Sequence, residues 1–458
     1  MSKNFDIIVV GAGIAGVAIA EMLSRSGKSV ALIEKNQKIG SEASADHHGW
    51  YHMGSLYSIF RKNIFPAALL SNFEQLINFY SHFDNMNIKI STLGKIETAS
   101  NLVQGWFTGH KINYYLACHN DTDFQLKGKS LIDKFRIMVL KIGWHLYIRK
   151  FIQRHNLFYN YNFCDLKRSK TIIPKARFWH HSREVISWLP NAMTNLDRNT
   201  HINVAGYDQT LRARIILSDL LTAFEQKNGS LLTSKTVEKI TRSENIYTVH
   251  CADESFTARK VIVASGKFID EINMDQFKSV KVKKIISPLA VVTPRLMNDN
   301  FVRMTPFVEK SINHLLHSVD NVEYSVVGGG YQLPADAGWE QRQSVEENLV
   351  SNINNVFKGF EKSKHSIQIY WGTKTEVTVG TNDRNYDYSV QRLDDNLFNV
   401  VPGKFSLCFG LAVSVYKVLL HELPPSSQDM RKITTQSSHS KTVEQTHYRK
   451  AMITERGE

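Results

Sequence analysis

The chain has 458 residues, more than a single compact core usually holds, so two or three domains are expected. Apolar residues make up 42% of the chain and charged residues 22%. This ordinary globular composition excludes a disordered, collagen-like or disulfide-scaffold protein. The formal net charge of +13 favours an anionic partner.

The cysteines and apolar runs bear on cellular location. The four cysteines are far apart and form no CxxC or metal-ligand spacing, which is typical of reduced thiols in a reducing compartment. No apolar run approaches the roughly 18 residues of a membrane span. The sequence also starts without the charged and apolar regions of a secretory signal. We therefore expect a cytoplasmic protein.

The first predicted elements are a strand, a glycine-rich turn, a helix and a second strand. Residues 5–10 form an apolar run rich in β-branched residues, as in a strand buried on both faces. Gly11, Gly13 and Gly16 follow at GxGxxG spacing and lead into a helical pattern. Residues 29–34 predict the second strand, which ends in Glu34.

This order of elements predicts a dinucleotide-binding unit. Gly11 allows the tight turn, Gly13 lets the backbone approach a pyrophosphate, and Gly16 lets the helix pack on the strand. The helix N-terminus offers N–H groups and a positive dipole end to the phosphates. Glu34 can accept hydrogen bonds from a ribose hydroxyl. A lone GxGxxG is a weak signal, whereas the complete series of elements is specific.

The next segment distinguishes FAD from NAD. Small residues over 40–45 are followed by Gly49, His52 and Gly54 in a G-x-x-H-x-G pattern. This resembles the segment that wraps the flavin in the D-amino-acid-oxidase-like superfamily, which includes FAD-dependent glycerol-3-phosphate and L-2-hydroxyglutarate dehydrogenases. The resemblance implies FAD as cofactor. It places His52 near the isoalloxazine as a base, an orienting group or a covalent attachment point, with a supporting role as the alternative.

Three later stretches resemble the same family in the same order. They are residues 213–229, the helix opening the second FAD-domain segment; residues 260–266, a small-residue strand beside the dinucleotide; and residues 396–406, which close over the flavin. The resemblance implies that Lys404 stabilises the charge of the reduced flavin, with a solvated loop lysine as the alternative. It also implies these cofactor-binding residues: Gly11, Gly13, Ile14, Ala15, Gly16, Glu34, Lys35, Ser44, Gly54, Val237, Ala264, Gly266, Gly403, Lys404, Phe405 and Ser406.

The substrate-binding stretch departs from the family pattern. Glycerol-3-phosphate enzymes hold their anionic substrate with an arginine, and the matching stretch 371–376 carries Lys374 instead. Lysine lacks the planar fork of arginine, so bidentate phosphate recognition is weakened. Arg384, shortly downstream, is a candidate for that fork. An anionic substrate is therefore expected at Lys374 and Arg384, with solvated side chains as the alternative for both.

The reaction expected is a hydride transfer to flavin N5 from a CH–OH, or CH–NH, group of a small anionic or sugar-like substrate. No second GxGxxG leads into a helix, which argues against a separate NAD(P)H domain. One alternative is a flavin monooxygenase or tailoring enzyme reduced by NAD(P)H, and another is a non-catalytic FAD-binding scaffold for a membrane or partner. No metal is expected, because His47–His48 and His180–His181 lack further ligands.

The predicted fold class is α/β: a Rossmann-like, three-layer FAD-binding domain with a mostly parallel sheet, joined to a discontinuous α+β substrate domain on a mixed sheet. The FAD domain is expected over 1–100, 201–275 and 368–423, and the substrate domain over 101–200 and 276–367. Residues 281–294 and 324–327 are expected strands of that second domain. The polar composition of 424–458 predicts a flexible tail.

The positive charge is concentrated in one segment. Between Lys127 and Arg183 there are fourteen lysines and arginines but only two acids. Within it, a basic amphipathic helix is predicted near 131–155, with Leu131, Phe135, Met138, Val139, Ile142 and Leu146 at helical spacing. The pattern suits a helix on the anionic inner face of a membrane, where a quinone would accept electrons. A helix packed on the substrate domain is the alternative, and nucleic-acid binding is not favoured.

Overall fold

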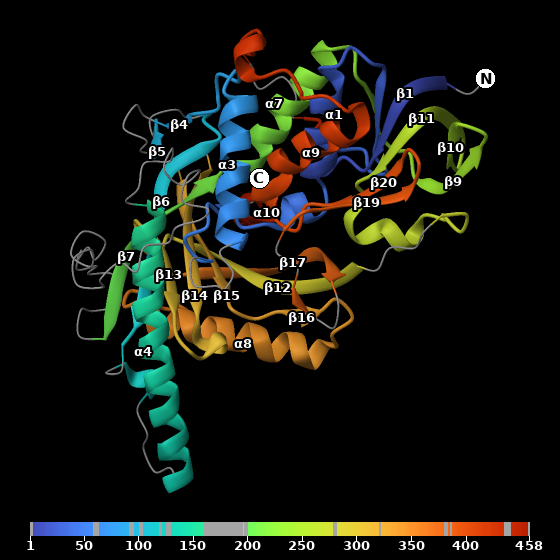
Figure 1. The fold of residues 1–458 in the computed structure, drawn as a ribbon. Coiled ribbons are helices and arrows are strands. Elements are labelled where there is room, and N and C mark those ends of the chain that lie inside the picture. Colours follow the sequence, from blue (N-terminus) through green and yellow to red (C-terminus); the bar gives the residue numbers. More distant parts are fainter. Residues whose placement is uncertain are drawn as a thin grey trace.

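The computed structural model describes residues 3–57, 64–90, 96–99, 104–118, 121–124, 130–159, 196, 200–277, 282–319, 322–379, 383–384, 387–434 and 441–456. Two large sheets organise these residues into two layered parts, which lie one above the other in Figure 1. The predicted fold class, a Rossmann-like FAD domain with an α+β second domain, is confirmed.

The first sheet has the order β19-β20-β11-β1-β2-β8. Its central strands β1, β2, β8, β11 and β20 are all parallel, as expected for a dinucleotide-binding domain. The predicted strands at 5–10 and 29–34 correspond to β1 and β2. The strands are β1 (Lys3–Val10), β2 (Val30–Ile33), β8 (Ser230–Leu232), β9 (Val237–Ser243), β10 (Ile246–Cys251), β11 (Ser255–Val263), β19 (Ser389–Asp394) and β20 (Leu397–Val401).

Four helices cover one face of this sheet. They are α1 (Ile14–Ser24), α3 (Ile64–Tyr80), α7 (Ala213–Gln226) and α9 (Cys408–Leu420). Their apolar side chains share one large core with β1 and β2, in which α1 is buried along its whole length. The β9–β10 hairpin and the 3₁₀ helix η2 (Gly266–Glu271) cover the opposite face with a second apolar cluster. The sheet is therefore buried on both faces, which explains the continuous apolar run of β1.

The second sheet has the order β18-β17-β12-β15-β14-β13-β6-β7-β3 and is mostly antiparallel, with one parallel pair between β6 and β13. One helix, α8 (Trp339–Val356), packs beneath it through buried Leu349 and Ile353 (Figure 1). The strands are β3 (Trp50–Tyr51), β6 (Phe107–Ala117), β7 (His201–Leu211), β12 (Val282–Thr293), β13 (Asn300–Met304), β14 (Ile312–Val319), β15 (Val322–Gly329), β16 (Leu333–Pro334), β17 (Ser366–Val379) and β18 (Asp383–Arg384).

The remaining elements are short or peripheral. A two-stranded ribbon joins β4 (Ile88–Ile90) to β5 (Ile96–Thr98). Four 3₁₀ turns complete the loops: η1 (Thr122–Phe124), η3 (Val308–Lys310), η4 (Phe405–Leu407) and η5 (Ser427–Asp429). The short helix α2 (Ala43–Asp46) follows β2, and α10 (His447–Arg456) lies near the C-terminus.

The second sheet contains four strands from segments expected in the FAD domain. They are β3, β7, β18 and nearly all of β17. Their ladders explain this: β17 pairs along nearly its whole length with β12, β18 pairs with β17, and β7 pairs with both β6 and β3. The chain therefore leaves the second sheet later than the expected boundaries at 201 and 368.

The C-terminal segment contributes to the packing of both domains. Val443 and Tyr448 are buried, although both lie in the stretch 424–458 that was expected to be a tail. The backbone of Ile39 hydrogen-bonds to Thr442 and Glu444, and α10 packs against β12. His447 Nδ1 lies 2.7 Å from Asp46 Oδ1, so α10 is tied to α2. The polar composition of this segment did not predict these contacts.

One long helix, α4 (Leu131–Tyr159), projects away from both sheets in Figure 1. Its later part packs on the second sheet through Trp144, Ile148, Phe151 and Ile152. The apolar residues predicted at helical spacing in its first part remain exposed. Residues 127–129 and 160–183 of the basic segment lie outside the described residues. Within the described part of the chain, no helix is both long and apolar enough to cross a membrane.

Candidate FAD and substrate site

The turn between β1 and α1 is built around two glycines that the chain itself requires. Gly11 has a φ of +98°, and a Cβ there would meet the Ala264 carbonyl oxygen at 2.7 Å. A Cβ on Gly16 would collide with the carbonyl oxygen of Gly11. These two glycines bring α1 close to β1 and β11, as the sequence predicted. Ile14 and Ala15 are buried in the first turn of the helix.

Gly13 has a different requirement. Its backbone is extended, with φ −70° and ψ 178°, a conformation that any residue adopts. A Cβ there would meet only Ser44 Oγ, at an ordinary 3.4 Å. The adjacent Ile14 N–H donates to Ser44 Oγ over 2.9 Å, and the first turn of α1 carries no acid. Nothing in the described chain demands a glycine at position 13, whereas a pyrophosphate at the helix N-terminus would.

Glu34 stands at the carboxyl end of β2 and holds the turn together. Its Oε2 accepts the Ala12 N–H over 2.7 Å, and its Oε1 accepts the Asn36 N–H over 3.0 Å. Burial raises the pKa of Glu34 above its usual value, and these two hydrogen bonds partly offset that effect. A ribose partner for Glu34 remains a prediction. The carboxylate retains acceptor capacity beyond these two bonds.

Charged and aromatic side chains gather beside this end of the sheet. Lys35 Nζ lies 3.1 Å from the centre of the Phe268 ring and 3.4 Å from Glu42 Oε1. Lys267 pairs with the other oxygen of Glu42 over 2.8 Å. Val237 begins β9 and is buried in the hairpin cluster. Of these two residues, which the resemblance assigned to FAD, Lys35 follows β2 and Val237 begins the β9–β10 hairpin.

Several buried polar atoms between the glycine turn and the loop that carries His52 have no hydrogen-bond partner among the described residues. At the nucleotide end they are Asn36 Nδ2 and Ser265 Oγ, which follow the carboxyl ends of β2 and β11. Farther along it is His47 Nε2. Gly266 has a φ of +57° and open space where a Cβ would lie. Such atoms need partners, so the residues present fit an extended polar cofactor such as FAD.

His52 lies after β3, where the two domains meet. Its ring stacks on Trp50 with centroids 4.3 Å apart and lies 5.4 Å from the Tyr57 ring. Burial lowers the pKa of His52 to about 4, and the positive charges of Lys404 and Lys374 add to this effect, whereas Asp208 opposes it. His52 is therefore a neutral imidazole at pH 7. Gly54, two residues after His52, has a φ of +113°, in the region that favours glycine.

Asp208 on β7 is a buried carboxylate that the sequence analysis missed. It accepts hydrogen bonds from the Trp50 indole over 3.0 Å, the Met53 N–H over 2.8 Å and the Tyr114 hydroxyl over 2.8 Å. Its Oδ2 lies 3.6 Å from His52 Nδ1. Burial raises the pKa of Asp208, but His52 and these donors outweigh it, and the pKa falls below its ordinary value. No motif surrounds Asp208 in the sequence, so only the fold could identify it.

The stretch 402–406 closes on the same loop from the first domain. The Ser406 hydroxyl accepts a hydrogen bond from the backbone N–H of His52 over 2.8 Å. The Phe405 ring lies 4.6 Å from the His47 ring. Gly403 has a φ of +65°, and Lys404 Nζ lies 4.8 Å from the centre of the Tyr57 ring. The stretch expected to close over the flavin therefore contacts the loop that carries His52, and its closure over a flavin stays a prediction.

Asn72 on α3 fixes the end of this stretch. Its Nδ2 donates to the Ser406 carbonyl, and its Oδ1 accepts the Gly410 N–H over 2.6 Å. Asn72 is buried and was not identified from sequence, because an isolated asparagine within an apolar helix carries no motif.

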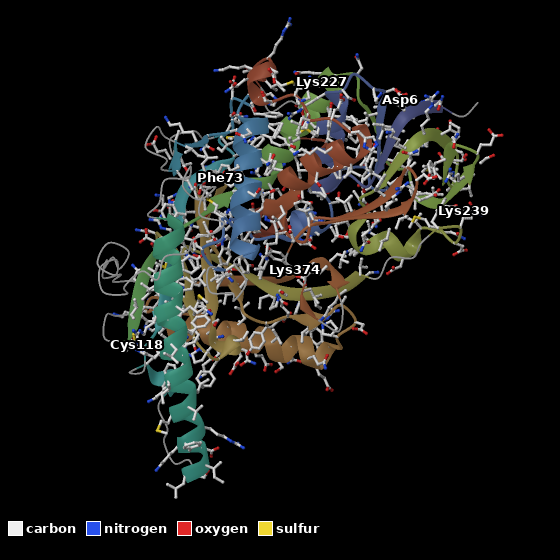
Figure 2. All side chains as sticks on the ribbon, in the orientation of Figure 1. Asp6, Phe73, Cys118, Lys227, Lys239 and Lys374 are labelled. Atoms are coloured by element: carbon white, nitrogen blue, oxygen red, sulfur yellow. The ribbon has the colours of Figure 1, made fainter. Side chains whose placement is uncertain are left out.

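The two predicted substrate contacts have different positions. Lys374 lies on β17 opposite Ile285 of β12, near the centre of Figure 2 where the two domains meet. Its charge lowers the pKa of His48, after the larger effect of burial, as well as that of His52. Arg384 lies on β18 and pairs with Thr378 of β17, and its side chain falls outside the description. Lys374, Lys404 and His52 are thus close enough to act on one another electrostatically.

Comparisons with known proteins agree with this arrangement at the nucleotide end. Residues 6–106 match the family described as DAO, FAD dependent oxidoreductase. A short match is found to the tRNA 5-methylaminomethyl-2-thiouridine biosynthesis bifunctional protein MnmC of Burkholderia mallei and Burkholderia pseudomallei, 49% identical over 47 residues. That match covers 10% of this chain and only 7% of the length of those proteins.

Solved structures share the fold over nearly the whole chain. The L-alpha-glycerophosphate oxidase of Mycoplasma pneumoniae, with FAD bound, has a TM-score of 0.61 and 14% identity and covers 94% of this chain and 98% of its own. Glycine oxidase from Geobacillus kaustophilus has a TM-score of 0.57 and 12% identity and covers 95% of this chain and all of its own. L-proline dehydrogenase from P. horikoshii has the same TM-score and identity and covers both chains completely.

At these identities the structural likeness shows the fold, and the sequence match at residues 6–106 adds the cofactor class. The glycine turn, the orphaned polar atoms and the closing stretch 402–406 fit a flavin dinucleotide. Residues 6–106 are therefore similar to the DAO family of FAD dependent oxidoreductases, and the fold of the described chain is the one that these solved structures share.

Proposed function

We propose that this flavoprotein oxidises a small anionic substrate that is bound between the two domains. The group oxidised is a CH–OH group or, as the alternative, a CH–NH group. The observation that carries the proposal is the meeting of two lysines with a neutral histidine. Lys374 comes from the second sheet, Lys404 from the first domain, and both charges act on His52. Two cations at an aromatic-lined site favour a carboxylate or phosphate on the substrate.

Each residue has a separate role in this proposal. Bound FAD supplies a hydride acceptor at N5 of its ring. Lys374 holds the substrate anion, and Lys404 stabilises negative charge that develops beside the flavin. Arg384 is a further candidate for the substrate anion, on the strength of its position beside β17.

His52 would accept the proton of the substrate hydroxyl. Its Nδ1 side lies toward Asp208, which leaves Nε2 for the substrate. The buried carboxylate of Asp208 would stabilise the imidazolium that forms, in the way that an acid orients and supports a catalytic histidine. The Ser406 hydroxyl accepts the backbone N–H of His52, and this hydrogen bond would hold the loop in place beside Lys404.

The test is an anaerobic titration of the purified holoprotein, followed by flavin absorbance near 450 nm. The panel comprises glycerol 3-phosphate, L-2-hydroxyglutarate, lactate, amino acids, sugar phosphates and NADH. Bleaching by one anionic hydroxy or amino compound would support the proposal, and Lys374→Met should raise the concentration needed. Lys358→Met, an exposed lysine on the second domain, serves as the matched control. Bleaching by NADH alone would instead indicate a monooxygenase-type enzyme, and bleaching by nothing would favour a non-catalytic flavoprotein.

We propose in addition that α4 lies on an anionic membrane surface, where a quinone accepts the electrons. Seven apolar side chains in the first part of the helix are between 50% and 84% exposed: Leu131, Ile132, Phe135, Met138, Val139, Ile142 and Leu146. At 100° per residue they form one stripe, with Lys134 and Lys141 along one side and Arg136 along the other. An apolar stripe flanked by cations suits insertion between anionic headgroups.

A further inference from the structure

A cavity lies away from the glycine turn and from His52. It has a volume of about 230 Å³ and is lined by four elements from both domains: β6, the first turns of α7, the β14–β15 hairpin and the start of α10. None of its lining residues belongs to the glycine turn, and Lys374, Lys404 and His52 do not line it. His317 connects it to the loop before β3, because the ring nitrogen Nε2 lies 2.9 Å from the His48 carbonyl oxygen.

Three arginines line this cavity. Arg212 and Arg214 come from the start of α7, and Arg449 comes from α10. Arg212 Nη1 donates to the Gly105 carbonyl over 2.8 Å, which fixes one guanidinium in the wall. Burial lowers the pKa of Arg214, the neighbouring charge of Arg449 lowers it further, and Glu444 opposes both effects. Two guanidinium groups that repel each other at a partly buried position favour an anion nearby.

The two acids in the lining have other partners. Asp219 accepts the Trp106 indole N–H over 2.7 Å and a hydrogen bond from Asn85 over 3.0 Å. Glu323 forms an ion pair with Arg295. The cavity wall thus carries three guanidinium groups and two carboxylates.

Further donors line the same space. Ser218 Oγ and Tyr324 Oη are buried and have no hydrogen-bond partner within the described part of the chain. Burial raises the pKa of Tyr324 well above its usual value, so its phenol keeps its proton and can donate. The 14-residue helix α7 begins here with no acid in its first turn and no side-chain cap. Its positive dipole end therefore adds to the field of the arginines.

We propose that this cavity binds a phosphate group, either free or as the head of a small metabolite, at a site separate from the flavin and the substrate. Arginine forks match phosphate oxygens in bidentate geometry, and hydroxyl donors from Ser218 and Tyr324 complete the partners that a tetrahedral oxyanion needs. Because Arg212 and Arg214 belong to α7 and Arg449 to α10, a bound phosphate joins the FAD domain to the C-terminal segment.

The experiment is a calorimetric titration of the FAD-loaded protein with inorganic phosphate at constant ionic strength, with chloride as the balancing anion. We expect one saturable site in the wild type. The double variant Arg214→Gln/Arg449→Gln should weaken binding about tenfold or more, because each charge-assisted hydrogen bond contributes at least that factor. Arg392→Gln, an exposed arginine paired with Asp395, is the matched control and should bind as the wild type does.

Two conservative variants keep the test independent of folding. Tyr324→Phe and Ser218→Ala each remove only a hydroxyl, and each should weaken phosphate binding several-fold while the flavin spectrum stays unchanged. A titration with ribose 5-phosphate identifies the source: tighter binding than phosphate, lost in the double variant, indicates a phosphate ester, and equal binding indicates the free ion.

The proposal is overturned if the wild type shows no saturable phosphate binding, or if the double arginine variant binds as tightly as the wild type. It is also overturned if Lys374→Met abolishes binding while the arginine variant retains it, because the phosphate would then occupy the substrate site. None of these readouts requires turnover, so they stand apart from the test of the oxidation reaction.

Discussion

His52 Nδ1 lies 3.6 Å from Asp208 Oδ2, and this pair links the loop after β3 to β7 of the second sheet. Asp208 also accepts the N–H of Met53, so the carboxylate fixes both the ring and the backbone that carries it. From the first domain, the Ser406 hydroxyl accepts the backbone N–H of His52. The histidine is therefore positioned by both domains at once, and a shift of either domain would move it.

The charges around His52 predict that substitutions of Lys404 and Asp208 shift the pH dependence of the reaction in opposite directions. His52, with a pKa of about 4, is neutral above that pH, so kcat/KM should fall as the pH drops toward 4. Lys404→Met removes a positive charge that lowers the pKa of His52, so the acidic limb should move to higher pH. Asp208→Asn removes a negative charge that raises it, so the limb should move to lower pH. Each displacement should be roughly one pH unit.

A histidine NMR titration of the same variants provides a readout that does not depend on turnover. If both substitutions moved the limb in the same direction, or if the His52 ring titrated near the ordinary histidine pKa of 6.5, the electrostatic account of this histidine would be wrong. Asn72→Ala, which removes the hydrogen bonds to Ser406 and Gly410 without adding a charge, would separate a structural disturbance from a charge effect.

Two glycine substitutions should separate cofactor binding from folding. Gly13→Val places a side chain where the described chain leaves space, so the protein should fold and lose FAD affinity by at least about tenfold. Gly16→Ala drives a Cβ into the Gly11 carbonyl, so it should lower the thermal midpoint of the apoprotein itself. Flavin absorbance after gel filtration and apoprotein melting curves measure the two effects. A yellow, stoichiometric Gly13→Val protein would refute the proposed pyrophosphate position.

The nucleotide end of the fold was predictable because its signals are local. Gly11, Gly13, Gly16 and Glu34 lie within one strand–helix–strand unit, where each residue type has one steric or hydrogen-bonding reason. The hydrophobic runs of β1 and β2 follow from burial on both faces of a parallel sheet. Short-range patterns of this kind are visible in a single sequence.

The substrate side was less predictable because its contacts are non-local. Asp208 acquires its role only when β7 pairs with β3, and Asn72 only when α3 packs beside the closing stretch. The C-terminal segment has a polar composition, yet it supplies Tyr448 and Arg449 to a cavity wall. Composition describes the average environment of such a segment, whereas a few buried contacts decide where it lies.

Buried neutral histidines predict a loss of stability in mild acid. Burial is the main cause that lowers the pKa of each of these: to about 3 for His47, His82 and His314, to about 4 for His52 and His317, and well below its usual value for His48. Between pH 6.5 and about 4, the unfolded chain binds protons at these positions and the folded chain does not. Stability present above pH 6.5 is therefore lost as the pH falls, by about 1.4 kcal/mol per pH unit for each fully neutral histidine.

Urea denaturation of the apoprotein at pH 7.0, 6.0 and 5.0 measures this loss. His314→Asn replaces a histidine whose Nε2 lies 2.6 Å from Ser325 Oγ, and it should reduce the slope with pH even if it lowers stability at pH 7. A free energy of unfolding that stays constant from pH 7 to 5 would contradict the neutral state of the buried histidines.

The exposed stripe on α4 predicts binding to anionic vesicles. Phe135→Ser/Val139→Ser/Ile142→Ser removes the apolar stripe, and Lys134→Gln/Arg136→Gln/Lys141→Gln removes its flanking cations. Each cation near an anionic surface contributes about 1 kcal/mol, so the charge variant should bind phosphatidylserine-containing vesicles about 100-fold more weakly. Salt does not screen the burial of apolar area, so some vesicle binding by the wild type should persist at high salt. The apolar variant should lose that salt-resistant binding.

Co-sedimentation with phosphatidylcholine vesicles, with and without phosphatidylserine, measures both effects. A control variant, Lys358→Gln/Lys362→Gln/Lys364→Gln, removes the same charge from an exposed loop after α8 and should sediment as the wild type does. Sedimentation that falls equally in this control would show a response to net charge alone and would refute docking by α4. If the wild type fails to sediment with either vesicle while it remains monomeric and flavin-loaded, the helix does not bind lipid. If the protein instead self-associates, and the apolar variant does not, the stripe is a contact between two copies of the chain.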